Sequence, residues 1–271
     1  MKPDLRALLP IAAEAAARAR HRVLAGPATS VQAKGDRDMV SDVDLAVESE
    51  LRAFLSAETP EIGFFGEEKG LYDLGQELTW VLDPVDGTAN FVRGLPLCGI
   101  SLGLLRGDRA ILGVIDLPFL DSRFSAAEGH GCTCNGDRVA VSEKTNLRDA
   151  IVSIGDYAVG PGAETRNRPR LAITKLLAER AQRIRMLGSA AIDLAWVAAG
   201  KLDASLMLSN HPWDTAAGVA IAREAGALVL DLDGSSHTER SQATIAVAPG
   251  LRDEVLTLLA DAFASTSTAK D

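Results

Sequence analysis

The chain has 271 residues, of which 47% are hydrophobic and 24% are charged, and this is the composition of an ordinary globular protein. It excludes a disordered, collagen-like or disulfide-scaffold chain, and the length allows one large domain or two tightly joined ones. The 28 basic and 37 acidic residues give a formal net charge of −9, which argues against a nucleic-acid partner because phosphate contacts need a basic face. A small phosphorylated substrate remains compatible with this charge if its site supplies cations.

The cellular compartment is predicted from the cysteines and from the absence of long apolar segments. Cys98, Cys132 and Cys134 are an odd number with one Cys-x-Cys pair, which favours reduced thiols, and they have no partners at zinc-ligand spacing. No apolar run approaches the roughly 20 residues of a membrane span, and charges interrupt the N-terminal apolar region. We therefore predict a cytoplasmic protein that does not bind a membrane.

The first part of the chain is predicted to form two helices and then a β-rich region. Apolar residues recur at three- and four-residue spacing over 4–24, which predicts an amphipathic helix that ends at Gly26-Pro27. A second helix is expected over 42–56, with Ser41 as its N-cap. Strands are expected over 62–65, 80–82, 100–105, 110–116, 122–127 and 138–141, with turns at 106–109 and at Asn135-Gly136.

The second part of the chain alternates strand and helix. Strands are expected over 151–154, 202–208, 227–230 and 244–248, and helices over 167–180, 189–199, 213–225 and 252–263. Ser189 is the expected N-cap of the second of these helices, and the small, polar tail 264–271 is expected to fray. With no linker or repeat in sight, we predict an N-terminal half, 1–147, and a C-terminal half, 148–271, joined in one compact unit.

Acidic residues follow predicted strands or begin predicted helices, and the densest group is Asp83-Pro-Val-Asp-Gly-Thr88. Two carboxylates lie three residues apart around a proline of fixed φ, and Gly87 lets the backbone approach a ligand closely. Thr88 is expected to open a short helix whose first N–H groups would face an anion. Taken alone, an Asp-x-x-Asp segment fits equally well a tight turn whose aspartates cap backbone groups.

The other acidic positions favour a cation site over that turn. Glu67 and Asp214 lie before and after the segment, and two carboxylates at about 4 Å would repel by roughly 4 kcal/mol at an effective dielectric of 20. If the carboxylates converge, they therefore require cations. Oxygen ligands favour Mg²⁺ or Mn²⁺ over zinc, and the segment lacks the alternating oxygen ligands of a calcium loop.

Two segments, Asp83–Thr88 and Trp213-Asp214-Thr-Ala-Ala-Gly218, resemble the two signatures of the inositol monophosphatase family. The resemblance covers about residues 5–260 and extends, in the same order and spacing, to Lys34, 38–44, 66–68, Asn135-Gly136 and 188–190. It implies an α/β (α+β) fold, namely a layered αβαβα sandwich of the inositol monophosphatase / fructose-1,6-bisphosphatase type. It also implies Mg²⁺-dependent, Li⁺-sensitive hydrolysis of a phosphomonoester by a homodimer.

The resemblance also implies residue roles. Glu67, Asp83 and the Val85 carbonyl would hold one Mg²⁺, and Asp83, Asp86 and Asp214 a second, while Glu67 would reach a third ion through waters. Thr88 and Asp44 would orient the attacking water, so that no Ser or Cys nucleophile is needed; the implied catalytic group is Asp44, Glu67 and Thr88. The implied substrate contacts are Asp86, Gly87, Thr88, Gly188, Ser189, Ala190 and Asp214.

The expected substrate is a small phosphorylated polyol or sugar, with inositol 1-phosphate first. Histidinol phosphate, other sugar phosphates and 3′-phosphonucleotides are alternatives within the same chemistry, and a non-catalytic regulatory member is a different class. Many inositol-type relatives carry a glutamate seven residues before the second-signature aspartate, where this chain has Met207, which is only a weak hydrogen-bond acceptor. We therefore expect poor discrimination among polyol and sugar phosphates, unless Asp156 or Asn210 supplies another acceptor.

Overall fold

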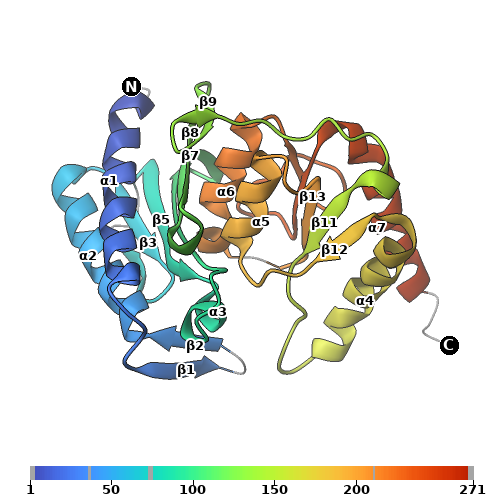
Figure 1. Cartoon of the computed structure of the whole chain (residues 1–271), viewed down its shortest axis with the longest axis horizontal. Helices are drawn as coiled ribbons and strands as arrows, with labels where there is room; N and C mark the ends of the chain where they lie inside the picture. The colour runs from blue at the N-terminus through green and yellow to red at the C-terminus, as the bar shows by residue number, and fades with distance from the viewer. Residues whose placement is uncertain (1–3, 36–37, 73–75, 210, 268–271) are drawn as a thin grey trace.

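The computed structural model describes residues 4–35, 38–72, 76–209 and 211–267, which form five layers in the order helix, sheet, helix, sheet, helix (Figure 1). Helices α1 (Leu5–Leu24) and α2 (Asp42–Glu58) cover the outer face of an eight-stranded sheet. Helices α5 (Ala190–Ala198) and α6 (Pro212–Glu224) lie between this sheet and a five-stranded sheet. Helices α4 (Ala163–Arg180) and α7 (Arg252–Ser267) cover the far side. The predicted layered sandwich is confirmed.

The eight-stranded sheet has the order β10-β9-β8-β7-β6-β5-β3-β4 and is antiparallel except between β3 and β5. The hairpin predicted around 106–109 is confirmed, and so is the turn at Asn135-Gly136, whose φ angles of 51° and 92° are both left-handed. The strands are β3 (Gly63–Gly66), β4 (Gly70–Tyr72), β5 (Leu78–Asp86), β6 (Gly99–Arg106), β7 (Arg109–Leu117), β8 (Ser122–Ala127), β9 (Gly131–Cys134) and β10 (Asp137–Arg138).

The five-stranded sheet has the order β12-β11-β13-β15-β14. Its strands are β11 (Ile151–Ile154), β12 (Arg183–Arg185), β13 (Ala204–Met207), β14 (Leu228–Leu230) and β15 (Thr244–Val247). Strand β11 runs parallel to β13 with Ser153 opposite Ser205. Because side chains alternate between faces, Val152 and Leu206 pack toward α4 and α7, whereas the two serines and Met207 face the layer of α5 and α6.

The contact between α6 and the eight-stranded sheet depends on two glycines that pair across β6 and β7, Gly103 and Gly113. A Cβ atom at Gly103 would lie 2.7 Å from the backbone nitrogen of Ala217, and one at Gly113 would overlap the Ala217 carbonyl. The backbone of α6 therefore rests directly on the backbone of the sheet, with no side chain between them.

Several element boundaries differ from the prediction. The strand expected over 80–82 continues to Asp86, because β5 keeps pairing with β6 across a bulge between Asp83 and Asp86. The strand expected over 138–141 is wrong beyond Arg138, and the preceding strand β9 was not predicted. Residues 264–267 are helical rather than frayed, while 268–271 lie outside the described residues. The division into halves at 147 and 148 stays a prediction.

Shorter elements complete the chain. A hairpin of β1 (Val31–Gly35) and β2 (Asp38–Ser41), which was not predicted, carries Lys34 on its first strand. The predicted short helix at Thr88 is α3 (Thr88–Val92), and single 3-10 turns are η1 (Pro118–Leu120), η2 (Leu147–Asp149) and η3 (Pro249–Leu251). Within the described ranges, the helices are too short or too polar to cross a membrane.

Candidate active site

The end of β5 carries the first two carboxylates of the site. Asp83 is buried, and its Oδ1 accepts a hydrogen bond of 3.0 Å from the Val85 amide. Gly87 follows with a φ of 86°, and a Cβ atom there would lie 2.8 Å from the Leu97 carbonyl oxygen and 3.0 Å from that of Gly188. Only glycine fits this position, which brings the segment after β5 against the residues that precede α5.

Asp86 joins β5 to the start of α5. Its Oδ2 accepts hydrogen bonds of 2.6 Å from both the Ser189 hydroxyl and the Ala191 amide. Ser189 is also the N-cap of α5, as predicted, since its Oγ accepts a bond of 3.3 Å from the Ile192 amide. Burial raises the pKa of Asp86 to about 7, although the Ser189 hydrogen bond opposes the shift, and the charge of Asp214 adds to it.

Thr88 and Asp44 lie in contact at the start of α3. The Thr88 hydroxyl is 3.2 Å from Asp44 Oδ1 and 3.0 Å from the Val85 carbonyl oxygen. Asp44 is held in turn by a capping box at the start of α2, in which its Oδ2 accepts from the Ser41 hydroxyl and, at 2.9 Å, from the Ser41 amide. Burial raises the pKa of Asp44, while the Ser41 and Thr88 hydrogen bonds lower it.

Glu67 and Lys34 form the outer side of the same cluster. Glu67 directly follows β3, and its amide donates to the Leu82 carbonyl at 3.1 Å, which places it beside the end of β5. The Lys34 ammonium lies 2.6 Å from Glu67 Oε1 and 3.0 Å from Glu68 Oε1. Burial raises the pKa of Glu68 to about 7, which the Lys34 hydrogen bond opposes.

Asp214 reaches the cluster from α6. Its Oδ2 accepts a bond of 2.9 Å from the His211 amide, and the preceding Trp213 ring packs edge-on against Phe65, with ring centroids 5.2 Å apart. Burial raises the pKa of Asp83 well above its ordinary value, and the charges of Glu67, Asp86 and Asp214 add to this shift. The convergence of these four carboxylates could not be established from their spacing in the sequence. In the structure, Glu67, Asp86 and Asp214 lie close enough to Asp83 for their charges to raise its pKa.

The donor set fits a hard divalent cation by its chemistry. All the side-chain ligands are carboxylates, as a hard cation prefers. Asp83 and Asp86 are buried, and the negative charges of neighbouring carboxylates raise the pKa of each. As placed, no three carboxylate, imidazole or thiolate groups of the described residues stand in position to hold a metal ion. Asp86 and Asp214 are turned onto protein N–H and hydroxyl donors, so a cation would compete with these hydrogen bonds.

A cavity of about 190 Å³ adjoins the carboxylates and is a candidate for the substrate pocket. Of the predicted substrate residues, Gly87 and Thr88 do not line it, and Asn210 lies outside the described residues. Sequence reasoning did not single out Gly155, Asp193 or Ser209. The lining residues are Asp86, Gly155, Asp156, Gly188, Ser189, Ala190, Asp193, Met207, Ser209 and Asp214.

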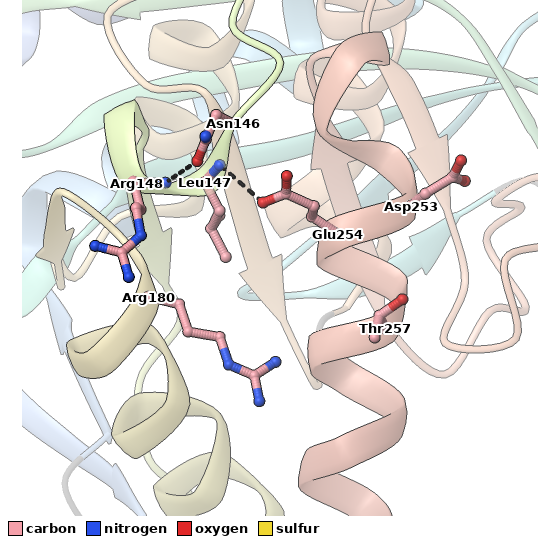
Figure 2. A pocket seen from close by; sticks show the side chains of 7 residues that line it. All are labelled: Asn146, Leu147, Arg148, Arg180, Asp253, Glu254 and Thr257. Carbon is pink, nitrogen blue, oxygen red and sulfur yellow. Dashed lines mark hydrogen bonds between the residues drawn. The ribbon is translucent and has the colours of Figure 1, made fainter.

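A more open groove of about 490 Å³ lies away from this cluster, between α4, α7 and the turn η2 (Figure 2). Several of its polar groups already have partners: the Leu147 amide donates to Glu254 at 2.9 Å, the Arg148 amide donates to Asn146 at 2.9 Å, and Arg180 pairs at 2.9 Å with Asp261, which lies outside the lining. It holds none of the predicted site residues. The smaller cavity beside Asp86 is therefore the better candidate for the substrate pocket.

Comparison with known proteins decides the family. The model of the inositol monophosphatase family matches residues 3–265, nearly the whole chain. The chain belongs to the inositol monophosphatase family. Members of this family are phosphoric monoester hydrolases, which agrees with the reaction class expected from the two signatures.

Relatives within the inositol monophosphatase family match the chain over most of its length. The inositol-1-monophosphatase ImpA of Mycolicibacterium smegmatis is 36% identical over 256 residues, which cover 94% of this chain and 92% of that protein. The fructose-1,6-bisphosphatase/inositol-1-monophosphatase of Thermotoga maritima is 35% identical over 226 residues, 82% of each chain. The crystal structure of the extragenic suppressor protein suhB from Bartonella henselae superposes with a TM-score of 0.86 and 30% identity, covering 93% of this chain and 98% of that chain.

Proposed function

We propose that this protein hydrolyses small phosphate monoesters, inositol 1-phosphate among them, with two or three Mg²⁺ ions held by Glu67, Asp83, the Val85 carbonyl, Asp86 and Asp214. The observation that carries the proposal is the convergence of these carboxylates from three separate elements around the buried Asp83. In the described part of the chain, no lysine or arginine pairs with Asp83 or Asp86. Divalent cations would supply this missing positive charge and would make a water molecule a nucleophile at neutral pH.

The protein's own contribution to the attack lies in Thr88 and Asp44. The Thr88 hydroxyl has one hydrogen, and when it donates this hydrogen to Asp44 rather than to the Val85 carbonyl, its lone pairs can accept a hydrogen bond from a water molecule. The capping box at Ser41 fixes the Asp44 carboxylate, so that the direction of this relay is set before substrate binds. Ser189 and Ala190 border the adjacent cavity, where the alcohol part of the ester would lie.

The substrate range is proposed to be broad. Met207 lines the cavity and offers no strong acceptor to a substrate hydroxyl. The Thermotoga maritima relative bears a name that combines fructose-1,6-bisphosphatase with inositol-1-monophosphatase, which supports including sugar phosphates. Li⁺ inhibition and a homodimer are further proposals from the family, and a cytoplasmic location is supported by the free thiols of Cys98, Cys132 and Cys134.

The test is phosphate release from inositol 1-phosphate, glycerol 2-phosphate, a hexose phosphate, histidinol phosphate and a 3′-phosphonucleotide, with Mg²⁺ or with a chelator. Activity should require the cation, and Asp83→Asn should abolish it, whereas Asp253→Asn on the exposed side of α7 should not. Turnover by Asp83→Asn within a few-fold of native would contradict the cation assignment. A thousandfold native preference for inositol 1-phosphate, unchanged in Met207→Glu, would contradict the broad range, and no turnover of any ester would favour a regulatory role.

A further inference from the structure

One carboxylate that lines the candidate pocket has no role in the proposed cation site. Asp193 lies on α5, one turn after Ser189, and is 2% exposed. Its Oδ1 is buried and has no hydrogen-bond partner among the described residues, yet the side chain forms part of the cavity wall. Buried polar atoms in native proteins nearly always have a partner, so a carboxyl group with an unpaired oxygen in the cavity wall can turn toward a bound group and gain one.

Two serines of the five-stranded sheet lie on the face that α5 covers. Ser153 and Ser205 are opposite each other on β11 and β13, both fully buried, and neither hydroxyl has a hydrogen-bond partner in the described structure. Burial raises the pKa of Asp193 well above its ordinary value, and the nearby Ser153 hydroxyl opposes this shift, although the two groups lie outside hydrogen-bonding geometry. A small rotation of either side chain would join them, and the serine would then orient the carboxylate from behind.

The other groups of the cavity leave Asp193 as the acceptor best suited to the alcohol part of the ester. Met207 presents an apolar wall, and Asp86 and Asp214 belong to the proposed cation site. Asp156 also lines the cavity, but it is exposed, so water competes for its oxygens. A hydrogen bond to a buried acceptor discriminates more strongly, because a substrate without the matching hydroxyl leaves that acceptor unpaired.

We propose that Asp193, oriented by Ser153, binds a hydroxyl group on the alcohol part of the substrate and is a specificity-determining residue of the pocket. This inference rests on the proposed phosphatase function. It assigns to α5 the hydroxyl recognition that position 207 does not supply. The ligand class is a polyol or cyclitol phosphate with a free hydroxyl near the ester, in contrast to an aryl phosphate, which has none.

The experiment compares kcat and KM for inositol 1-phosphate and for p-nitrophenyl phosphate, at saturating Mg²⁺, in the native protein and in Asp193→Ala. Loss of the Asp193 acceptor leaves the substrate hydroxyl unpaired in the pocket, which should lower kcat/KM for inositol 1-phosphate about 10- to 100-fold, mainly through KM. The value for p-nitrophenyl phosphate should stay within about threefold. Asp156→Ala tests the competing carboxylate of the same cavity, and it should change the ratio of the two substrates less than Asp193→Ala does.

Asp193→Asn keeps the side-chain volume and one acceptor oxygen, so if the alanine variant does not fold it should show the same selective effect on inositol 1-phosphate with a smaller loss. Ser153→Ala should raise KM for inositol 1-phosphate alone, by a smaller factor. An equal loss for both substrates, or a change of the ratio in Asp156→Ala instead, would overturn the role of Asp193 and leave the phosphatase intact. If the native protein hydrolysed neither ester, the proposed function would fail and this inference with it.

Discussion

Replacing Ser189 by alanine tests how Asp86 is held. The Ser189 hydroxyl makes two interactions in one place: it donates to Asp86 Oδ2 at 2.6 Å, and it accepts from the Ile192 amide at 3.3 Å. The substitution therefore removes a helix cap and one of the two donors to a buried carboxylate. The Ala191 amide remains, also at 2.6 Å, so Asp86 keeps one partner.

The expected cost follows from these two contacts. Loss of an N-cap hydroxyl costs about 1 kcal/mol, and loss of a hydrogen bond to a charged group about 1.5–3 kcal/mol. Because one hydroxyl makes both contacts, the sum is an upper bound, and we expect about 2–3 kcal/mol when Asp86 is ionised. Burial raises the pKa of Asp86 to about 7, so near pH 5 the carboxyl is protonated, and the cost should fall toward the cap term of about 1 kcal/mol.

The assay is urea unfolding in a chelator at pH 5 and pH 8, followed by tryptophan fluorescence. Ser189→Thr, which keeps the hydroxyl, should lose little stability at either pH. Ser265→Ala on α7 is a second control, because that hydroxyl donates to the Ala262 carbonyl of its own helix. A loss below about 0.5 kcal/mol in Ser189→Ala, or the same loss at both pH values, would refute the assignment of this hydroxyl to Asp86.

Three further predictions concern the same cluster. Thr88→Ala and Asp44→Asn should lower kcat about 10²- to 10⁴-fold with little change in KM, and a rise in KM alone would contradict the water relay. Asp214→Asn should weaken Mg²⁺ binding roughly 10-fold or more by calorimetry, and native affinity would remove Asp214 from the cation site. Without divalent cations, the native protein should become less stable relative to Asp86→Asn as the pH rises from about 4 to 7. The reason is that Asp86, with a folded-state pKa of about 7, binds more protons in the folded than in the unfolded state over this range. Parallel dependence of the two unfolding free energies on pH, measured in urea, would refute this.

Much of the fold follows from local signals in the sequence. The period of apolar residues in α1, the Ser41 N-cap of α2 and the Ser189 N-cap of α5 are short-range features, and each lies where it was predicted. The errors fall where pairing with a neighbouring strand decides the outcome. Strand β9 is a four-residue Gly-Cys-Thr-Cys segment that forms a strand because β8 lies beside it, and β5 reaches Asp86 only because β6 continues to pair with it.

The residues of the candidate site also fall into two groups, those that the sequence could identify and those that it could not. The residues around Asp83 could be named from their spacing and from the family resemblance, since each belongs to a contiguous motif. Asp193 could not, because it reads as one polar position on an apolar helix and gains its meaning from the cavity beside it. Ser153 and Ser205 are 52 residues apart and become neighbours only through the parallel pairing of β11 and β13. The sequence pattern around each of these serines, a serine among the apolar residues of a strand, also occurs in many sheets that bind no ligand.

The bare contact between α6 and the sheet sets the position of Asp214. Gly103 and Gly113 let the helix backbone rest on the strand backbone, so no flexible side chain can absorb an error in their spacing. Asp214 stands in the first turn of that helix, while Asp83 and Asp86 stand at the end of β5, the strand next to β6 in the same sheet. The separation between the α6 backbone and the sheet therefore sets the distance between Asp214 and the carboxylates of Asp83 and Asp86. A single methyl group added at Gly113 would shift Asp214 away from the site without touching any residue that binds cation or substrate.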